Sequence, residues 1–221
     1  MSDQRVLNAI DIRYGDLAEQ SCCLSCGGAI DKSQAKPGEV CVDLGSGRGT
    51  DLVRLAEAVG ETGKVHGVDI SDGMLAKAAR TVEKLGLTDL ISLHKSNLEY
   101  IPLKCSSVDL LISNCTINHA ADKGEVWKEV FRILKDGGRF VVSDIYSLQP
   151  IPEKFAKDPA AIAECWAGSV TRDVYLKQLS DAGFSRIDIL EESKPYPKGE
   201  TEVCSWTIQG IKSGGGSCCS K

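Results

Sequence analysis

Cysteine is the reactive residue type that stands out in this sequence of 221 residues, which contains ten cysteines and only three histidines. Cys115 directly follows a run of aliphatic residues, and Cys165 lies in the segment ECWAG. A third group, Cys22, Cys23 and Cys26, lies in a polar stretch near the N-terminus. A lone cysteine is most often a small buried side chain. Thiolates are also soft donors, so this density of thiols indicates soft-ligand binding or redox chemistry.

A glycine-rich loop forms a second candidate site. The segment Asp43-Leu44-Gly45-Ser46-Gly47-Arg48-Gly49 ends an apolar run and precedes a helical pattern that Thr50 or Asp51 would cap. Its glycines allow a ligand to approach the backbone closely. Asp69 ends the next apolar run, about 20 residues after the loop, where a carboxylate can accept hydrogen bonds from a ribose diol. The dinucleotide-binding fingerprint needs Gly or Ala at position 50, so the loop departs from it.

The elements that must position these residues alternate between strand and helix patterns. Helical spacing is found at residues 50–59, 71–85, 123–134 and 171–182. Strands are predicted at residues 40–43, 64–69, 91–95, 108–114, 139–144, 186–191 and 203–211. This order predicts a parallel sheet covered by helices on both faces, with ligands bound beyond the carboxyl ends of the strands.

Composition excludes several classes of function. Acidic side chains outnumber basic ones by 31 to 26, the net charge is -5 and the pI is about 5.3, so nucleic acid is not an expected partner. No apolar run approaches the roughly 18 residues of a membrane helix. The polar N-terminal segment predicts a cytoplasmic location, where a disulfide framework is not expected. We expect a helix and cysteine-rich loop capping the active site at 1–35, a catalytic domain at 36–212 and a flexible tail at 213–221.

The loop, Asp69, the Asn97-Leu98-Glu99 turn and the Lys135-Asp136-Gly137-Gly138 turn together resemble class I S-adenosylmethionine methyltransferases over residues 36–211. The resemblance implies an α/β fold, a doubly wound, mostly parallel, Rossmann-like sheet of seven strands whose last strand is antiparallel. It implies S-adenosylmethionine as the cofactor, with Asp69 on the ribose hydroxyls and Asn97, where many relatives carry an acid, near the adenine. The cofactor-binding residues expected are Asp43, Gly45, Ser46, Gly47, Asp69, Ile70, Asn97, Leu98 and Asn114.

Four further segments, SNCTINHAADK, ECWAG, CLSCGG and RYGDLAE, resemble arsenite methyltransferases. The resemblance implies trivalent arsenic bound by the thiolates of Cys26, Cys115 and Cys165, with the arsenic lone pair free to attack the methyl group. It also implies that Cys26 forms a disulfide with Cys23 or Cys22 when the methylated arsenic is reduced to the trivalent state. A thiol reductant such as thioredoxin or glutathione then reopens the disulfide. The protein is expected to act as a monomer in arsenic detoxification.

Two other functions compete with this interpretation. A methyltransferase of a quinone or another small organic substrate would use His119 or Tyr14 as a base. A thiol-based metal-binding protein would hold zinc with Cys22, Cys23, Cys26 and a distant cysteine, although a second CxxC is missing. The glycine-rich tail ends in Cys218-Cys219, which would either capture a metalloid for delivery or have no function.

Overall fold

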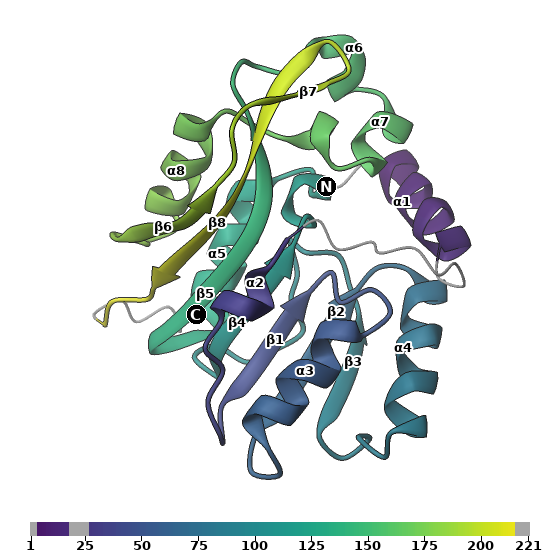
Figure 1. Cartoon of the computed structure of the whole chain (residues 1–221), viewed down its shortest axis with the longest axis vertical. Helices are drawn as coiled ribbons and strands as arrows, with labels where there is room; N and C mark the ends of the chain where they lie inside the picture. Colours follow the sequence, from purple (N-terminus) through teal and green to yellow (C-terminus); the bar gives the residue numbers. More distant parts are fainter. Residues whose placement is uncertain (1–3, 18–26, 215–221) are drawn as a thin grey trace.

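Eight strands form a single sheet in the computed structural model, which describes residues 4–17 and 27–214 (Figure 1). The strand order is β3-β2-β1-β4-β5-β8-β6, and the short β7 pairs with β8. Strands β1 to β5 are parallel, whereas β8 runs antiparallel to both β5 and β6. The strands are β1 (Val40–Leu44), β2 (Lys64–Asp69), β3 (Ile91–Lys95), β4 (Val108–Asn114), β5 (Leu134–Ser147), β6 (Ile187–Glu192), β7 (Tyr196–Lys198) and β8 (Thr201–Ile211). The expected fold class is confirmed.

Helices cover both faces of this sheet because successive strand residues point in opposite directions. Val42 and Leu44 of β1 join the cluster that contains Trp127, whereas Cys41 of the same strand joins the cluster that contains Leu55. One face is therefore covered by α2, α3 and α4, and the other by α5 and α8 (Figure 1). These helices are α2 (Ala29–Lys32), α3 (Thr50–Val59), α4 (Asp72–Lys84), α5 (Lys123–Ile133) and α8 (Arg172–Asp181).

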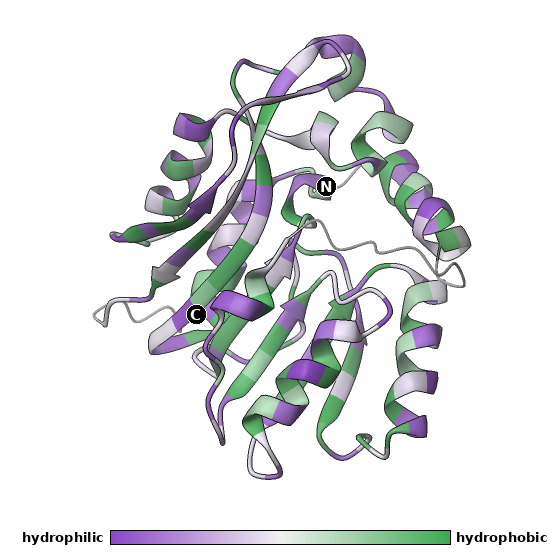
Figure 2. Cartoon of the chain, in the orientation of Figure 1, coloured by the Kyte–Doolittle hydropathy of each residue, from purple (hydrophilic) through white to green (hydrophobic). Residues whose placement is uncertain are grey.

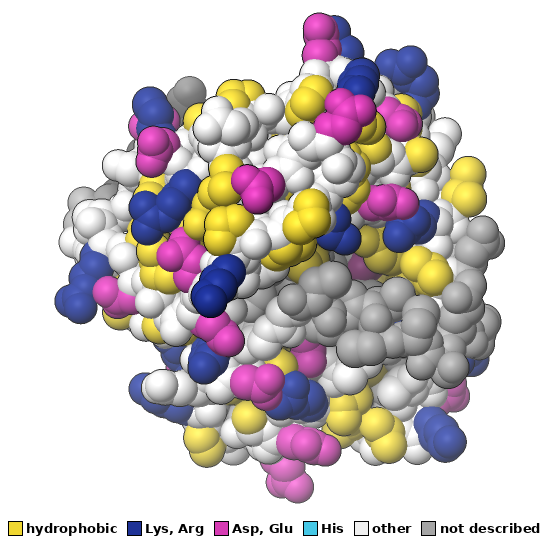
Figure 3. All heavy atoms as spheres, turned by 45° about the horizontal axis from the view of Figure 1, so that its top comes forward, with side chains coloured by type: hydrophobic (Ala, Val, Ile, Leu, Met, Phe, Trp, Pro, Cys, Tyr) yellow, Lys and Arg dark blue, Asp and Glu magenta, His cyan; other side chains and the backbone are white. Residues whose placement is uncertain are grey.

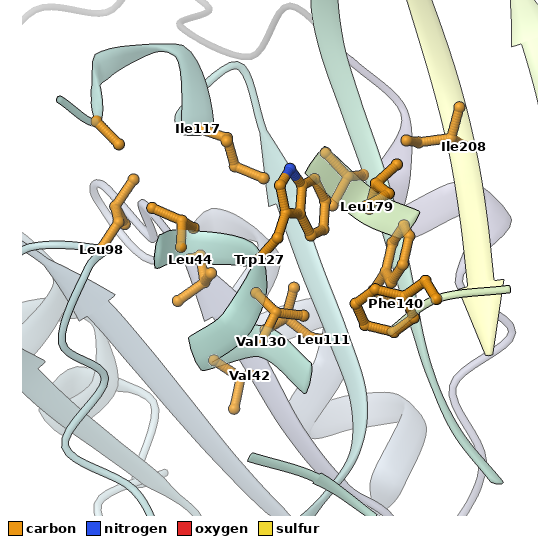
Figure 4. Packing of buried hydrophobic residues seen from close by; sticks show 14 of the residues in the cluster. Val42, Leu44, Leu98, Leu111, Ile117, Trp127, Val130, Phe140, Leu179 and Ile208 are labelled. Carbon is orange, nitrogen blue, oxygen red and sulfur yellow. The ribbon is translucent and has the colours of Figure 1, made fainter. Parts of the chain in front are cut away.

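The larger core cluster is rich in aromatic side chains. Trp127 of α5 is fully buried and lies 4.9 Å, ring centre to ring centre, from Phe140 of β5 (Figure 4). Its ring also meets Tyr175 of α8 edge-on. Figure 2 shows the same division along the ribbon, with hydrophobic residues concentrated in the central strands and hydrophilic residues on the outer surfaces of the helices. Burial of these large apolar surfaces fixes α5 and α8 against the sheet.

Each predicted strand and helix is present, with ends that differ by a few residues in most cases. Strand β5 begins earlier, at Leu134, because the expected turn at Gly137 bulges out between the pairs Val108–Leu134 and Leu110–Arg139. The sequence did not predict β7 or the short helices α2, α6 (Glu153–Ala156) and α7 (Pro159–Ala163). Elements of three to five residues are too short to show a hydrophobic period.

Helix α1 (Gln4–Leu17) lies apart from the sheet and contacts α7 and α4 (Figure 1). Arg13 is 3.7 Å from the carboxylate of Glu164, just after α7, and Asp11 accepts a hydrogen bond of 3.2 Å from the backbone N–H of Asp72 at the start of α4. These contacts tie α1 across the carboxyl edge of the sheet. The boundaries 1–35, 36–212 and 213–221 remain predictions.

Charged side chains of both signs are interspersed on the face seen in Figure 3. The net charge of -5 is therefore not gathered into a single-sign patch on that face. Among the described residues, no helix is both long and apolar enough to span a membrane.

Candidate active site at the carboxyl edge of the sheet

A cavity of about 630 Å³ lies at the carboxyl ends of β1, β2 and β4, beside α1. Its walls include every residue predicted to bind the cofactor, together with Cys115 and Cys165. The predicted lining residues are Asp43, Gly45, Ser46, Gly47, Asp69, Ile70, Asn97, Leu98, Asn114, Cys115 and Cys165. Helix α1 contributes further lining residues, among them Arg13 and Tyr14. Residues far apart in the sequence therefore meet in one cavity of the size that small-molecule sites commonly have.

The glycine loop requires glycine at two positions of this wall. Gly45 has φ of 73°, and a Cβ atom there would lie 2.1 Å from Thr116 Oγ1. Gly47 has φ of 51°, and its backbone N–H donates a hydrogen bond of 2.8 Å to Asp69 Oδ2. The left-handed backbone and the close approach of Thr116 favour residues without a side chain. The loop thus brings its backbone and Asp69 to one side of the cavity.

Asp43 is a buried carboxylate that forms no ion pair with any of the described residues. Its side chain is 4% exposed, and none of the described residues donates a hydrogen bond to it. Burial raises the pKa of Asp43 well above its ordinary value, and the charges of Asp51 and Asp69 raise it further. Ser46 Oγ is also buried without a partner among the described residues. A buried carboxylate and a buried hydroxyl that lack hydrogen-bond partners among the described residues are expected where a ligand with a cationic, hydrogen-bonding group binds.

Asp69 is held in place by its own loop. Its Oδ1 accepts a hydrogen bond of 2.9 Å from the Ser71 N–H, and its Oδ2 accepts the one from Gly47. Burial raises its pKa, and these backbone hydrogen bonds oppose the rise. The backbone of Ile70 also hydrogen-bonds to Asp69, and a carboxylate has about four acceptor positions, so Asp69 retains capacity for a hydroxyl group of a ligand.

Cys115 and Cys165 come together although 50 residues separate them in the sequence. Their sulfur atoms and a carboxylate oxygen of Asp144 all lie within 4.8 Å of one another. The Cys165 thiol donates a hydrogen bond of 3.0 Å to the Cys115 carbonyl oxygen and lies 3.9 Å from Asp144 Oδ1. Two thiols and a carboxylate at this spacing can hold a soft or borderline cation.

The backbone of both cysteines is in an unusual conformation. Cys115 has φ of 51° and Cys165 has φ of 74°, and they are two of only four non-glycine residues with positive φ in the described chain. An L-residue in this region costs about 1–3 kcal/mol, and such strain gathers at functional sites. The fold therefore holds both sulfurs toward the cavity at a cost in stability.

This strain predicts that a glycine variant at Cys165 is more stable than an alanine variant, the reverse of the usual order. We expect Cys165→Gly to be more stable than Cys165→Ala by about 1 kcal/mol, because glycine adopts positive φ freely. Cys204, a buried residue inside β8, is the matched control, where the glycine variant should be the less stable by about 0.5–1 kcal/mol. Denaturant unfolding of the four variants measures the difference. Greater stability of alanine at both positions would show that Cys165 is unstrained.

Asp144, on β5, was not among the predicted site residues. It is 1% exposed and accepts hydrogen bonds from Asn118 Nδ2 at 2.8 Å and from the Tyr175 hydroxyl at 3.4 Å. Burial raises the pKa of Asp144 to about 7. An acid in the middle of the apolar segment VVSDIY is the signal that could have drawn attention to it.

The remaining residues that were predicted for the site or as alternatives either lie in or near the cavity wall or fall outside the described residues. Asn114 donates from Nδ2 to Asp51 at 2.9 Å and accepts from the Ala29 N–H at 3.2 Å, so it joins three segments of the wall. His119 is buried, with Nε2 3.4 Å from the Tyr14 hydroxyl, and burial lowers its pKa to about 4. The residues Cys22, Cys23, Cys26, Cys218 and Cys219 lie outside the described part of the chain.

Comparisons with known proteins connect this geometry to a family. A family model described as a methyltransferase domain matches residues 35–193. The arsenite methyltransferase of Halobacterium salinarum is 35% identical over 166 residues, which cover 75% of this chain and 42% of that protein. A ubiquinone/menaquinone biosynthesis C-methyltransferase of Klebsiella pneumoniae is 27% identical and matches 72% of this chain and 71% of its own.

A solved structure extends the likeness over nearly the whole chain. It is that of an arsenic(III) S-adenosylmethionine methyltransferase from Chlamydomonas reinhardtii, with a TM-score of 0.75 and 27% identity. The match covers 96% of this chain and 74% of that one. The chain spans about two fifths of the length of the curated arsenite methyltransferases that it matches.

Proposed function

The chain belongs to the methyltransferase-domain family, and from this premise we propose that it transfers a methyl group from S-adenosylmethionine to trivalent arsenic bound by cysteine thiolates. The single observation that carries the proposal is the pair Cys115 and Cys165, held by strained backbone beside the cavity that contains the predicted cofactor residues. The likeness to arsenite methyltransferases supports the same substrate.

The residues of the cavity fit the cofactor. S-adenosylmethionine, when bound, supplies an electrophilic methyl group on a positively charged sulfur. Asp43 and the Ser46 hydroxyl, which have no ion-pair or hydrogen-bond partner in the part of the chain that the structure describes, suit its charged methionine end. Asp69 would accept hydrogen bonds from the ribose hydroxyls, and Asn97 and Leu98 would flank the adenine. Ile70 and Asn114 complete the wall between these groups.

Thiolate ligands suit trivalent arsenic because both partners are soft. Three sulfurs around arsenic would leave its lone pair free to act as the nucleophile, so the protein has to orient the substrate but needs no strong general base. The lone pair would form the arsenic–carbon bond while the carbon–sulfur bond of the cofactor breaks. This agrees with a site in which His119 is the one histidine among the described lining residues and is a weak base with a pKa of about 4.

We propose Cys26 as the third ligand and Cys23 as its partner in a disulfide. Both lie outside the described residues, but Gly27, next to Cys26, packs closely against the last residue of β4 and against Ser143 of β5. A Cβ atom on Gly27 would lie 2.2 Å from Ser143 Cβ and 2.8 Å from Asn114 Oδ1. The chain therefore passes beside Cys115 immediately after Cys26. A small thiol or thioredoxin in a reducing cytoplasm would reopen the disulfide.

The experiment that tests this proposal measures the methylation of arsenite directly. The reduced protein is incubated with arsenite, S-adenosylmethionine and a small thiol, and the arsenic species are separated by chromatography with element-specific detection. We expect methylated arsenic in amounts that exceed the enzyme, which shows turnover. Unchanged arsenite together with normal cofactor binding would refute the arsenic substrate and leave the methyltransferase assignment intact.

A second candidate, methylation of a quinone or another small organic molecule, is favoured by the likeness to the ubiquinone/menaquinone enzyme and by the contact between Tyr14 and His119 in the cavity wall. The low pKa of His119 argues against it, because a neutral imidazole of that pKa accepts a proton weakly. The zinc-binding alternative predicts stoichiometric zinc that survives chelation, which metal analysis of the purified protein would detect.

A further inference from the structure

Two thiols of the cavity wall and the buried carboxylate of Asp144 form a compact group of possible metal ligands. The sulfur atoms of Cys115 and Cys165 and an oxygen of Asp144 all lie within 4.8 Å of one another. Three atoms that are at most 4.8 Å apart lie within about 2.8 Å of a common point. Zinc binds sulfur at about 2.3 Å and carboxylate oxygen at about 2.0–2.2 Å. Shifts of about 0.5–0.8 Å would therefore bring all three atoms within bonding distance of such an ion.

Asp144 is oriented by its own hydrogen bonds. Asn118 Nδ2 and the Ile145 N–H donate to its Oδ1, each at 2.8 Å, and the Tyr175 hydroxyl donates to its Oδ2 at 3.4 Å. A carboxylate has about four acceptor positions, so a fourth partner can still bind. Cys165 Sγ, 3.9 Å from Oδ1, lies on that side. Carboxylates that bind metal ions are commonly held by neighbouring hydrogen-bond donors in this way.

The backbone fixes the two thiols. The Cys115 N–H donates to the Ser143 carbonyl oxygen at 2.8 Å, and the Cys165 N–H donates to the Ile162 carbonyl oxygen at 2.8 Å. Ser143 directly precedes Asp144, so one stretch of β5 positions both the carboxylate and Cys115. Ligands that are held in place before an ion arrives lose little conformational freedom when they bind it.

The charges of the group match those of a divalent cation. With both thiols deprotonated, the two sulfurs and the carboxylate carry three negative charges. Lys123, which is 8% exposed, carries a positive charge beside them. Burial lowers the pKa of Lys123, and the charges of Asp144 and Cys165 oppose that change. A divalent cation would neutralise the remaining two negative charges and so avoid the cost of unpaired buried charge.

We propose that Cys115, Asp144 and Cys165 bind a thiophilic divalent cation such as cadmium or zinc. Binding forms two bonds to sulfur and one to oxygen, and the two thiol protons pass to solvent. Three protein ligands leave the fourth position of a tetrahedral ion open, so the ion can exchange through the cavity.

This inference rests on the proposed function in one respect, because the ion would compete with arsenite for two of its sulfurs. The third ligand separates the two species. Trivalent arsenic is expected to use the sulfur of Cys26, since a carboxylate oxygen is a hard donor, whereas a borderline divalent ion accepts Asp144. The divalent cation therefore does not need Cys26.

Binding can be measured without arsenic, with Cd²⁺ as the probe. Charge transfer from sulfur to cadmium absorbs in the ultraviolet, so a titration followed by absorbance reports cadmium bound to thiolates. Other cysteines could also bind the ion, so the titration uses a full-length background variant in which five of them are serine, namely Cys22, Cys23, Cys26, Cys218 and Cys219. We expect this background to bind one Cd²⁺ per chain. No charge-transfer band in it would refute the proposal.

Three substitutions in this background identify the ligands. Asp144→Asn keeps the shape of the side chain but not its charge, and it should weaken Cd²⁺ binding at least about tenfold. Cys115→Ser should lower the absorbance by about half or more, because one of two sulfurs is lost. Cys105→Ser, at another partly exposed cysteine, is the matched control and should bind like the background. Cofactor binding by each variant shows that it is folded. The proposal is wrong if folded Asp144→Asn binds Cd²⁺ as the background does, or if Cys115→Ser keeps the full absorbance.

Methylation assays separate this inference from the proposed function. With the wild-type cysteines present and a phosphine as reductant, because a small thiol would chelate cadmium, we expect Cd²⁺ to raise the apparent KM for arsenite. Asp144→Asn should raise the inhibition constant of Cd²⁺ at least several-fold. If the background binds Cd²⁺ through Asp144 but the wild type methylates no arsenic, the proposed function fails and the metal site stands. If arsenic is methylated and the inhibition constant is equal in the wild type and folded Asp144→Asn, the metal site fails and the proposed function stands.

Discussion

Replacement of Cys115 by serine is expected to lower arsenite methylation at least about a hundredfold, while binding of S-adenosylmethionine is unchanged. Serine keeps the size of the side chain but replaces a soft sulfur by a hard hydroxyl, so arsenic would lose a ligand and its alignment with the methyl group. The rate of methylated arsenic formation under excess arsenite, with cofactor affinity measured on the same sample, checks both parts of the expectation.

The matched control for this variant is Cys105→Ser. Cys105 is partly exposed, lies in the loop before β4 and does not line the cavity, so its replacement should leave the rate within about twofold. Activity of Cys115→Ser close to that of the wild type would refute the thiolate site. Under the organic-substrate alternative His119→Ala should cost more than Cys115→Ser, and under the arsenic proposal the order is reversed.

Replacement of Asp43 by asparagine is the second change with a large expected effect. The carboxylate is buried and forms no ion pair with a described residue, so a cationic ligand gains electrostatic attraction there. We expect the affinity for S-adenosylmethionine to fall at least about tenfold, as measured by calorimetry. Asparagine has the same shape and no charge to bury, so the free energy of unfolding without cofactor should be unchanged or greater.

The pH dependence of this affinity provides an independent check. The pKa of Asp43 is raised in the free protein and would fall when the cation binds, so affinity should rise as pH increases through the raised pKa and level off above it. Asp43→Asn should lose this part of the dependence. A smaller part remains, because burial also raises the pKa values of Asp51 and Asp69. An unchanged pH profile in the variant would show that Asp43 does not meet the charge of the cofactor.

Local sequence was sufficient to predict the longer strands and helices and the part of the site formed by the glycine loop and Asp69. The strands are marked by short apolar runs, and the helix that begins at Asp72 is preceded by its capping residue Ser71, which accepts a hydrogen bond from the Met74 N–H. The glycine loop and Asp69 were found because they are tied to consecutive strand ends of a parallel sheet. Topology alone brings such ends to one edge.

The expectation that Cys115 and Cys165 share a site came from resemblance, since nothing in their spacing of 50 residues joins them. Their left-handed backbone could not be predicted either, because it results from packing at both ends of each turn. The short helices α6 and α7, which precede Cys165 in the chain, were missed because segments of four and five residues show no measurable hydrophobic period.

The sequence by itself thus determined the order of strands and helices along the chain, the position of the glycine loop and the carboxylates near the carboxyl ends of β1 and β2. Hydrophobic periodicity and turn-forming residues act over a few neighbouring residues, so their pattern can be recognised in the sequence. Only the tertiary structure decided that Asp144 lies beside the two thiols, and that the buried Asp43 accepts no hydrogen bond from any described residue. These features depend on desolvation and on contacts between distant segments, which no local pattern records.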